Sequence, residues 1–358
     1  MNKKPTHYTL GIFPGEGIGP DLSDAAISTL DALQKKNNCN KLFEIKIGGE
    51  IGNQSIEKNG NSLDIDAINF CHSIFDSSGA ILAGPGGDRF VYECRDKFDL
   101  YYKLNPISPC LVSLGSRKVS KENLIGVDIL IIRENSGGIY QGKWSSDINS
   151  SGLRSASQVF EYNESQIQRI AEIACKKSRA RSKKLAVIVK PNGIPSVSNL
   201  WIDVVSKTAN LYKVTLECLE IDYAAFALIQ HPEKFDVILT SNLFGDVLSD
   251  IGGVLLGSRG LCYGASFSET GNAIYQTNHG AAYDLQGKNL ANPVGHLMAL
   301  AMMLEMSYKE DTLASQLKDA IRTTWSQGWR SKDLEEVNCK TLGTKEFTNK
   351  IIDNILTS

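Results

Sequence analysis

The 358-residue sequence has none of the cysteine or histidine spacings that mark a zinc site or a disulfide framework. Its eight cysteines form no CxxC pair and its five histidines form no HxxxH pair. Reduced thiols packed in the interior are therefore the simplest interpretation. The cysteines are Cys39, Cys71, Cys94, Cys110, Cys175, Cys218, Cys262 and Cys339.

The chain also lacks a charge excess, a long apolar run and a secretion signal. Lys and Arg total 38 against 40 Asp and Glu, for a net charge of −2, so nucleic acid is not an expected partner. The longest nearly apolar run, residues 297–306, falls well short of the roughly 20 residues that span a bilayer. Residues Met1–Lys4 precede a short alternating segment rather than a signal-peptide core. We therefore expect a cytoplasmic protein with no membrane segment.

The composition and length of the sequence are typical of a globular protein that is folded throughout. Hydrophobic residues make up 42% and charged residues 22%, and the length predicts about two domains. Apolar runs typical of strands alternate with segments of helical periodicity, which indicates an α/β protein with helices on the faces of a sheet. Strands are predicted at residues 8–13, 42–47, 79–83, 127–132, 185–189, 214–221 and 235–240, and helices at 21–34, 293–308, 311–326 and 346–357.

Two stretches interrupt this alternation of strands and helices. Residues 144–157 are rich in serine and have little helical periodicity, which fits either a flexible loop or a projecting arm. Residues 252–292 are rich in Gly, Ala, Ser, Tyr and Asn, and their weak periodicity predicts a long functional loop region.

A glycine-rich turn separates the first predicted strand from the first predicted helix. A dinucleotide-binding fingerprint needs a glycine three residues after Gly17, but that position is Pro20. No acidic residue clearly ends a second strand about 20 residues later, as that fingerprint also requires. The segment from Gly15 to Pro20 is therefore interpreted as a tight turn that lets the backbone approach a ligand or another loop.

Three aspartates are candidate metal ligands. Asp246 and Asp250 are four residues apart, so on a helix they share one face. Like charges at that spacing repel each other unless a cation or donor lies between them, and Mg²⁺ prefers such carboxylates. The alternative is that Asp246 interacts with the dipole of a helix N-terminus. Asp222 follows a predicted strand, where helix capping is the alternative to metal binding.

Three other residues, Arg95, Arg133 and Lys190, lie near the ends of predicted elements and are candidates for binding a ligand. Arg95 and Arg133 can bind carboxylates bidentately, and structural or surface ion pairs are the alternative. Tyr140 follows Arg133 by seven residues. Lys190 ends a predicted strand, at the kind of sheet edge where ligands of α/β proteins collect, and a solvated lysine is the alternative.

These segments occur together in one order along nearly the whole chain. The most specific is the string from Asn242 to Gly253, which reads N-L-F-G-D-V-L-S-D-I-G-G. The others are Gly15–Pro20, Gly84–Gly87, Arg95, Arg133–Tyr140, Lys190–Asn192, Asp222, His279–Asp284, Asn292–Pro293 and Gly343–Thr348. In this order they resemble the β-decarboxylating dehydrogenases of 3-isopropylmalate and isocitrate, and they are closest in type to the isopropylmalate enzymes.

The resemblance implies an isopropylmalate-dehydrogenase-like α/β fold of two domains, with a mixed sheet that spans both domains and a cofactor site that is not of the Rossmann type. Residues 1–104 and 258–358 would form the cofactor-side domain. Residues 105–257 would form the dimerisation and substrate domain, with a projecting arm near residues 144–165. A homodimer with shared active sites is therefore expected.

The reaction that the resemblance implies is the NAD-dependent oxidative decarboxylation of a 3-substituted malate, with a divalent metal that stabilises the enolate. In this family Lys190 and Asp222 would come from the neighbouring subunit. The implied assignments are Asp222, Asp246 and Asp250 as ligands of Mg²⁺ or Mn²⁺, Lys190 as the base or its relay, Tyr140 as the acid, and Arg95 and Arg133 as carboxylate binders.

The resemblance also implies a nicotinamide cofactor. Asp284 falls where NAD-using members place an acid that accepts from the ribose hydroxyls and repels a 2′-phosphate, so NAD is expected rather than NADP. The alternative for Asp284 is an exposed turn aspartate. The other implied contacts are His279, Gly280 and Ala281 in the adenine-binding loop, Asn292 at the adenine and Asn192 at the nicotinamide amide.

Departures from the family pattern concern the substrate. Asn105 stands where the family usually has a second arginine, which removes a charge-assisted contact worth about 1.5–3 kcal/mol. Arg89, Val91 and Tyr92 lie in a shortened segment where the group at C3 is recognised. Arg89 either replaces the missing arginine or recognises an acidic group at C3.

Three functions follow from these observations. The first is oxidation of 3-isopropylmalate or a close 3-substituted malate, for which Val91 and Tyr92 offer apolar contacts. The second is oxidation of a substrate with an acidic group at C3, such as isocitrate, which Arg89 favours. The third is a non-catalytic regulatory subunit, which Asn105 favours and which the retention of the catalytic residues opposes.

Overall fold

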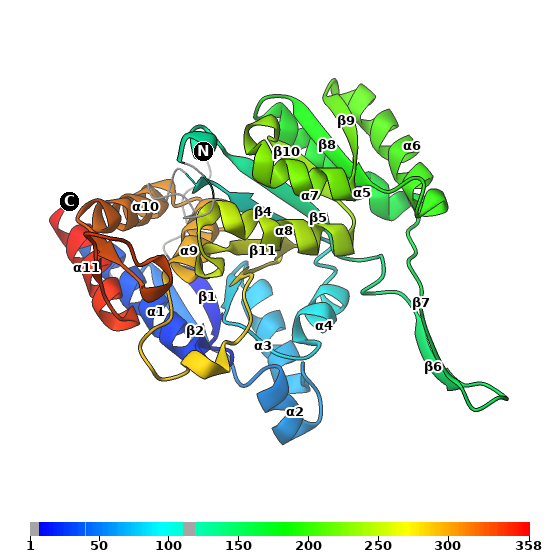
Figure 1. The fold of residues 1–358 in the computed structure, drawn as a ribbon. Coiled ribbons are helices and arrows are strands. Elements are labelled where there is room, and N and C mark those ends of the chain that lie inside the picture. Colours follow the sequence, from blue (N-terminus) through cyan, green and yellow to red (C-terminus); the bar gives the residue numbers. More distant parts are fainter. Residues whose placement is uncertain (1–6, 40, 110–118, 120) are drawn as a thin grey trace.

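The computed structural model describes residues 7–39, 41–109, 119 and 121–358 (Figure 1). Cys110 and the N-terminal residues Met1–Lys4, both considered above, lie outside the described residues. Helices and strands alternate along the described chain, which confirms the predicted α/β class.

The described residues form a ten-stranded sheet and two separate pairs of strands. The strands of the sheet are β1 (Tyr8–Phe13), β2 (Phe43–Ile47), β3 (Ala80–Ala83), β4 (Tyr102–Ile107), β5 (Ile129–Glu134), β8 (Lys184–Val189), β9 (Thr215–Glu220), β10 (Val237–Thr240), β11 (Tyr263–Phe267) and β12 (Ala273–Thr277). The smaller pairs are β6 (Trp144–Ile148) with β7 (Arg154–Gln158), and β13 (Trp329–Arg330) with β14 (Lys340–Thr341).

The large sheet is mixed, with the order β2-β1-β3-β12-β11-β4-β5-β10-β8-β9. The adjacent strands β2, β1, β3 and β12 run parallel to one another. The adjacent strands β5, β10, β8 and β9 also run parallel to one another. Between these two parallel groups, β11 and β4 pair antiparallel to each other and to the strands beside them. The sheet is therefore continuous from one side of the molecule to the other.

Helices cover this sheet, and their apolar faces build the core. The helix α8 packs on β4 and β5, while α9 packs on β11 and β12. No helix in the described part of the chain is long and apolar enough to cross a bilayer. The α-helices are α1 (Gly19–Lys36), α2 (Asn53–Asn59), α3 (Ile65–Phe75), α4 (Phe90–Lys97), α5 (Glu164–Arg179), α6 (Pro195–Tyr212), α7 (Ile221–Gln230), α8 (Asn242–Leu256), α9 (Val294–Met306), α10 (Asp311–Ser326) and α11 (Thr344–Thr357).

The predicted strands are all confirmed to within two residues, as are the four predicted helices. The prediction of a loop region over residues 252–292 is wrong, because α8 extends to Leu256 and the segment then forms β11 and β12. These two strands are buried in the middle of the sheet and carry small or aromatic residues instead of an apolar run. The strand β4 was not predicted either.

The serine-rich stretch forms the two-stranded antiparallel ribbon β6–β7, in which Trp144 pairs with Gln158 and Ile148 with Arg154. Every residue of both strands is exposed. Figure 1 shows the ribbon extending away from the rest of the molecule. The predicted division into two domains, and the pairing of this arm with a second subunit, stay predictions.

Candidate active site

The centre of the candidate site lies where β5 ends beside α8. The strands β5 and β10 are parallel, with Arg133 opposite Thr240, so the helix that follows β10 begins next to the end of β5. The guanidinium of Arg133 donates from Nε and Nη2 to Oδ1 of Asn242, at 3.0 and 2.8 Å. Its Nη1 forms an ion pair with Asp246. The first turns of α8 therefore hold Arg133 in a fixed orientation.

Tyr140 completes this centre from the segment that follows β5. Its hydroxyl donates to Oδ2 of Asp246 at 2.9 Å, and its ring meets that of Tyr92 on α4 edge-on, with centroids 5.4 Å apart. Burial, reinforced by the Asp246 carboxylate, raises the pKa of Tyr140 to about 12. Tyr140 is therefore protonated near neutral pH and acts as a hydrogen-bond donor or an acid.

Positive charge is concentrated at this centre and is almost fully buried. The exposed fractions are 4% for Arg95 on α4 and 2% for Arg133. No described residue accepts a hydrogen bond from Nε or Nη1 of Arg95. Burial, with repulsion from Arg133, lowers the pKa of Arg95 to about 9. Buried guanidinium groups without partners favour an anionic ligand, as the predicted carboxylate-binding role requires.

A third buried cation, Lys103 on β4, was missed by the sequence analysis. Lys103 is 4% exposed, and its pKa is lowered well below the usual value by burial and then by Arg95 and Arg133. A single lysine near the start of an unpredicted strand gave no signal of its own. Its position two residues before Asn105 was the available clue, since residues i and i+2 of a strand face the same way.

The candidate metal ligands fall into two groups. Asp246 and Asp250 lie one turn apart on α8, and Asp250 also forms an ion pair of 2.9 Å with Arg259. Asp222 lies in the first turn of α7, where its Oδ1 accepts from Lys190 Nζ at 2.9 Å. Among the described residues no three acidic, His or Cys side chains are placed to bind one ion. Carboxylate oxygens suit Mg²⁺ or Mn²⁺, so the donor chemistry fits although one chain does not assemble all three aspartates.

Lys190 lies with Asp222 at the same carboxyl edge of the parallel strands as Arg133, but two strands across the sheet, since β10 lies between β5 and β8. It follows β8, and its Nζ donates to Glu220 at 2.5 Å as well as to Asp222. These hydrogen bonds, the one to Glu220 first, raise the pKa of Lys190. Asn192, two residues further along the chain, is exposed. The predicted base and one predicted metal ligand thus form a group of their own, apart from the contacts of Asp246.

The residues predicted to recognise the substrate have different surroundings. The guanidinium of Arg89 lies over two aromatic rings, 5.3 Å from the centroid of Tyr92 and 5.0 Å from that of Trp144. Val91 packs instead against the apolar cluster beneath α3 and α4. Asn105 is buried, and its Oδ1 accepts from Asn278 Nδ2 at 3.0 Å. Tyr92 is therefore the member of this set that touches Arg89, Arg95 and Tyr140.

The predicted cofactor loop is joined to the glycine-rich turn. Ile18 N–H donates to the carbonyl of Ala281 at 2.9 Å. Gly17 has φ +57°, and a Cβ on it would lie 2.0 Å from that same oxygen, so only glycine fits here. The turn thus approaches another loop, one of the two alternatives that its sequence left open.

Glu16 fixes the same region and was also missed by the sequence analysis. Its carboxylate is fully buried and accepts from Tyr283 Oη at 2.6 Å, from Gln54 N–H at 2.7 Å and from Gly87 N–H at 2.9 Å. A glutamate inside a glycine turn gives no sequence signal of such long-range contacts. Through it, three separate segments are held around the start of α1.

The remaining predicted cofactor residues lie on or after this loop. Asp284 is exposed in a single helical turn, Tyr283–Leu285. His279 is partly buried and Gly280 is exposed. Asn292 is buried, where it accepts from Val294 N–H at 3.0 Å and donates to Asp333 at 3.1 Å. Asn292 therefore supports the start of α9, while the Asp284 carboxylate is open to a ligand.

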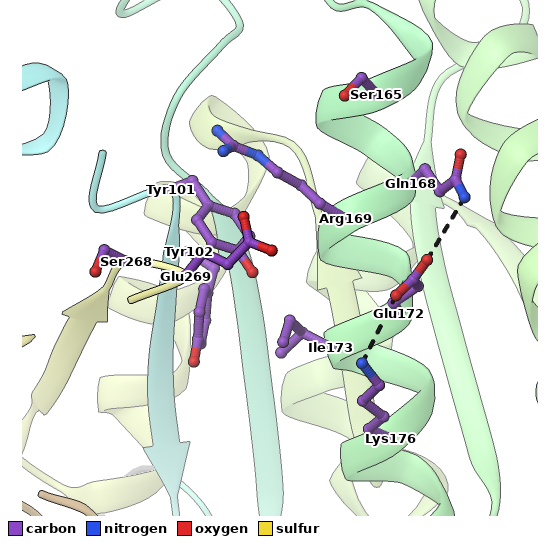
Figure 2. A pocket seen from close by; sticks show the side chains of 10 residues that line it. All are labelled: Tyr101, Tyr102, Ser165, Gln168, Arg169, Glu172, Ile173, Lys176, Ser268 and Glu269. Carbon is purple, nitrogen blue, oxygen red and sulfur yellow. Dashed lines mark hydrogen bonds and ion pairs between the residues drawn. The ribbon is translucent and has the colours of Figure 1, made fainter. Parts of the chain in front are cut away.

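A cavity of about 630 Å³ elsewhere contains none of the predicted site residues (Figure 2). It lies between α5 and the end of the sheet around Tyr101 and Ser268. Its polar side chains pair with one another, since Glu172 contacts both Gln168 and Lys176. This cavity therefore adds no predicted site residue to the group around Asp246.

Comparisons with known proteins agree with this arrangement. Residues 9–351 match the family described as isocitrate/isopropylmalate dehydrogenase. The 3-isopropylmalate dehydrogenase of Aquifex aeolicus is 34% identical over 361 residues, covering 97% of each chain. That of Geobacillus kaustophilus is also 34% identical, covering 98% of this chain and 96% of its own.

A solved structure also matches over the whole length. The crystal structure of isocitrate dehydrogenase from Methylococcus capsulatus has a TM-score of 0.86 at 26% identity, covering 98% of this chain and 100% of that one. The resemblance found in the motifs and the expected fold are both confirmed. The chain therefore belongs to the isocitrate/isopropylmalate dehydrogenase family and is a β-decarboxylating 2-hydroxy acid dehydrogenase, of a class that uses a nicotinamide cofactor and a divalent metal.

Proposed function

We propose that the chain catalyses the NAD-dependent oxidative decarboxylation of a 3-substituted malate similar to 3-isopropylmalate, yielding a 2-oxo acid, CO₂ and NADH. The observation that carries this proposal is the convergence of Arg133 and Tyr140 on Asp246, beside Arg95, whose buried Nε and Nη1 have no hydrogen-bond acceptor among the described residues. This arrangement brings together cationic groups that can bind an anion, a proton donor and a carboxylate that can bind a metal ion.

Each residue has a distinct part in the proposed reaction. Arg95 and Arg133 bind the carboxylates and orient the malate core. Lys190 takes the proton of the 2-hydroxyl, directly or by relay, as hydride leaves C2 for the nicotinamide. Asp222, Asp246 and Asp250 would hold a divalent metal, which would supply Lewis-acid stabilisation of the enolate. After CO₂ has left C3, Tyr140 donates its proton to that carbon.

The site is proposed to be shared between two copies of the chain in a homodimer. Asp246 and Asp250 lie on α8, whereas Lys190 and Asp222 lie at the ends of β8 and the start of α7. The helices α7 and α8 contact each other and carry exposed apolar side chains, which suits burial against a second copy. These side chains are Tyr223, Phe226, Val247 and Val254.

We propose an apolar or weakly polar group at C3 of the substrate. The edge-on rings of Tyr92 and Tyr140 support this proposal, as does Arg89, whose guanidinium already lies over Tyr92 and Trp144. Relatives that are 34% identical are named for 3-isopropylmalate. A substrate with an acidic C3 group is the second candidate, because no described residue forms an ion pair with Arg89.

The proposed function is tested by adding 3-isopropylmalate, isocitrate, malate and tartrate to the purified protein with NAD and Mg²⁺ or Mn²⁺. We expect the fastest NADH formation with 3-isopropylmalate or a close analogue, and its loss when a chelator removes the metal. A well-folded protein that forms no NADH from any of these acids would support the regulatory-subunit alternative.

The same assay on the Arg89→Ala variant separates the possible roles of Arg89. A loss confined to isocitrate would show that Arg89 binds an acidic C3 group, and a uniform loss would show that it binds the malate core. Unchanged activity with every substrate would remove Arg89 from the site.

Cofactor choice is predicted to depend on Asp284. The Asp284→Lys variant is expected to change the ratio of kcat/KM for NAD over NADP by about 10- to 100-fold towards NADP, because lysine attracts a 2′-phosphate that aspartate repels. Asp311→Lys, a charge reversal at an exposed position of α10, is the matched control and should leave the ratio unchanged. A parent protein that already prefers NADP would contradict the role of Asp284.

A cytoplasmic location is also part of the proposal, and the thiols support it. The seven cysteines among the described residues are all free, and four of them are buried. Burial raises the pKa of Cys71 and of Cys262 to about 12, so these thiols are weak nucleophiles. Free thiols used as small apolar groups are typical of proteins in a reducing compartment.

A further inference from the structure

Lys103 occupies a place in the sheet that directs it towards the candidate site. In the central strand β4 it lies opposite Arg133 of β5 on one side and opposite Ser266 of β11 on the other. Directly opposed residues of antiparallel strands face the same way, with Cβ atoms about 5 Å apart. Lys103 and Arg133 therefore leave the sheet on the face that α8 covers, where Asp246 lies.

The stem of Lys103 extends along the strands towards Asn105. Gly264 of β11 lies beside Asn105, and a Cβ built on it would be 3.1 Å from Lys103 Cε and 2.7 Å from Asn105 Oδ1. The missing side chain of Gly264 thus leaves the room that the lysine stem uses. The lysine fills space next to the residue that stands where the family usually has an arginine.

Two cations, Arg95 and Arg133, and the carboxylates of Asp246 and Asp250 act on Lys103. Arg95, Lys103 and Arg133 are each at most 4% exposed, and Asp246 is the carboxylate that pairs directly with one of them. Lys103 itself has no hydrogen-bond or ion-pair partner in the part of the chain that the structure describes. A buried amino group without a partner is destabilising and its charged form is disfavoured, so a purely structural role does not explain this lysine. An anion bound beside Lys103 would stabilise its charged form and would explain its position.

We propose that Lys103 binds a carboxylate of the malate core and supplies the positive charge that Asn105 lacks. Asn105 cannot do so, because it is neutral and its Oδ1 already accepts from Asn278. Lys103 is a substrate-binding residue shifted by two positions along the same strand face. This inference rests on the proposed function and names a further residue of the same site.

The Lys103→Met variant tests the role in binding. We expect KM for the best substrate to rise by about 10- to 150-fold, the range for a charge-assisted hydrogen bond, with a smaller change in kcat. The loss should be similar for every malate that the parent oxidises, because they share the malate core. Lys97→Met on the exposed side of α4 is the control and should keep the parent KM.

A second readout does not depend on turnover. Calorimetric titration of 3-isopropylmalate into the protein with Mg²⁺ but without NAD should show a matching loss of affinity in Lys103→Met. The melting temperature of the free variant should equal or exceed that of the parent, because an uncompensated buried charge has been removed. A purely structural lysine would give the opposite, a lower melting temperature with affinity unchanged, and that result would overturn the proposal.

Relocating the charge gives the decisive comparison. The double variant Lys103→Asn/Asn105→Arg puts the cation back at position 105 and should recover most of the affinity that Lys103→Asn alone loses. Failure of the double variant to recover affinity, while it melts at the parent temperature, would count against the inference. A parent protein that binds and oxidises no malate at all would instead refute the proposed function itself.

Discussion

Replacing Lys190 by methionine is expected to lower kcat by about 10²- to 10⁴-fold, the usual contribution of a general base. Methionine keeps much of the side-chain length but has no group that can take up a proton. In the structure the Lys190 ammonium donates to Glu220 and Asp222, and these contacts raise its pKa. The lysine is therefore protonated in this arrangement, and a metal held by Asp222 would relieve part of the pKa shift by withdrawing that carboxylate from the ammonium. Proton removal then becomes possible in the assembled site.

The Tyr140→Phe variant provides the contrast for Lys190. Tyr140 should protonate C3 only after CO₂ has left, so its loss should slow the complete reaction but leave reduction of a 2-oxo acid analogue by NADH largely intact. Lys190→Met should impair both assays. Lys207→Met is the matched control, since this exposed lysine of α6 pairs with Asp203 outside the site. If Tyr140→Phe and Lys190→Met lost both activities equally, the separate roles would be wrong.

Mixing two inactive variants is expected to restore activity. If the site is shared, Lys190→Met and Asp246→Asn remove residues that different subunits contribute to one site. A heterodimer then contains one site with both native residues and one site with neither. After denaturation and joint refolding at equal concentrations, half of the dimers are mixed, so about a quarter of the parent activity should return. If each variant alone loses about 10²- to 10⁴-fold, this is an increase of about 25- to 2,500-fold.

The controls for this experiment follow from the same geometry. Asp246→Asn refolded with Arg133→Met should show no recovery, because these residues form an ion pair within one chain. Each variant should elute as a dimer at micromolar concentration. A parent protein that stays monomeric at that concentration, or active parent with no recovery in the Lys190 and Asp246 mixture, would rule out the shared site.

Much of the fold could be predicted because apolar runs and helical periods are local signals. The strand β10, for instance, is buried at all four positions, follows a short 3-10 helix at Pro232–Lys234 and leads directly into α8. The strands β11 and β12 were not predicted, although every residue of β11 and all but Gln276 of β12 are buried. Their positions next to Tyr102, Leu104 and the face of α9 select small residues such as Ala265 and Gly264, which have low strand propensity. Tertiary packing, not local preference, makes this segment extended.

The candidate site, like the fold, could be predicted only where its residues belong to local sequence motifs. The aspartates of α8, Arg133 and Tyr140 belong to recognisable strings, and the structure does bring Asp246, Arg133 and Tyr140 together. Lys103 and Glu16 were missed because the residues that lie beside them in the fold are distant in the sequence. Strand register across β4 and β5 brings Lys103 to Arg133, and loop packing brings Glu16 to Tyr283. Contacts between residues so far apart in the sequence cannot be predicted from the identity of either residue.

The exposed ribbon β6–β7 has a consequence for the lifetime of the protein. A ribbon of two strands is barely stable alone in water, and here it ends in a tip with exposed Ile148 and Leu153. Exposed tips of this kind are preferred sites of proteolytic cleavage. A protomer that has found no second copy would offer this tip to cellular proteases, whereas an assembled pair would cover it. Dimer formation would then protect a protomer from proteolysis as well as complete its active site.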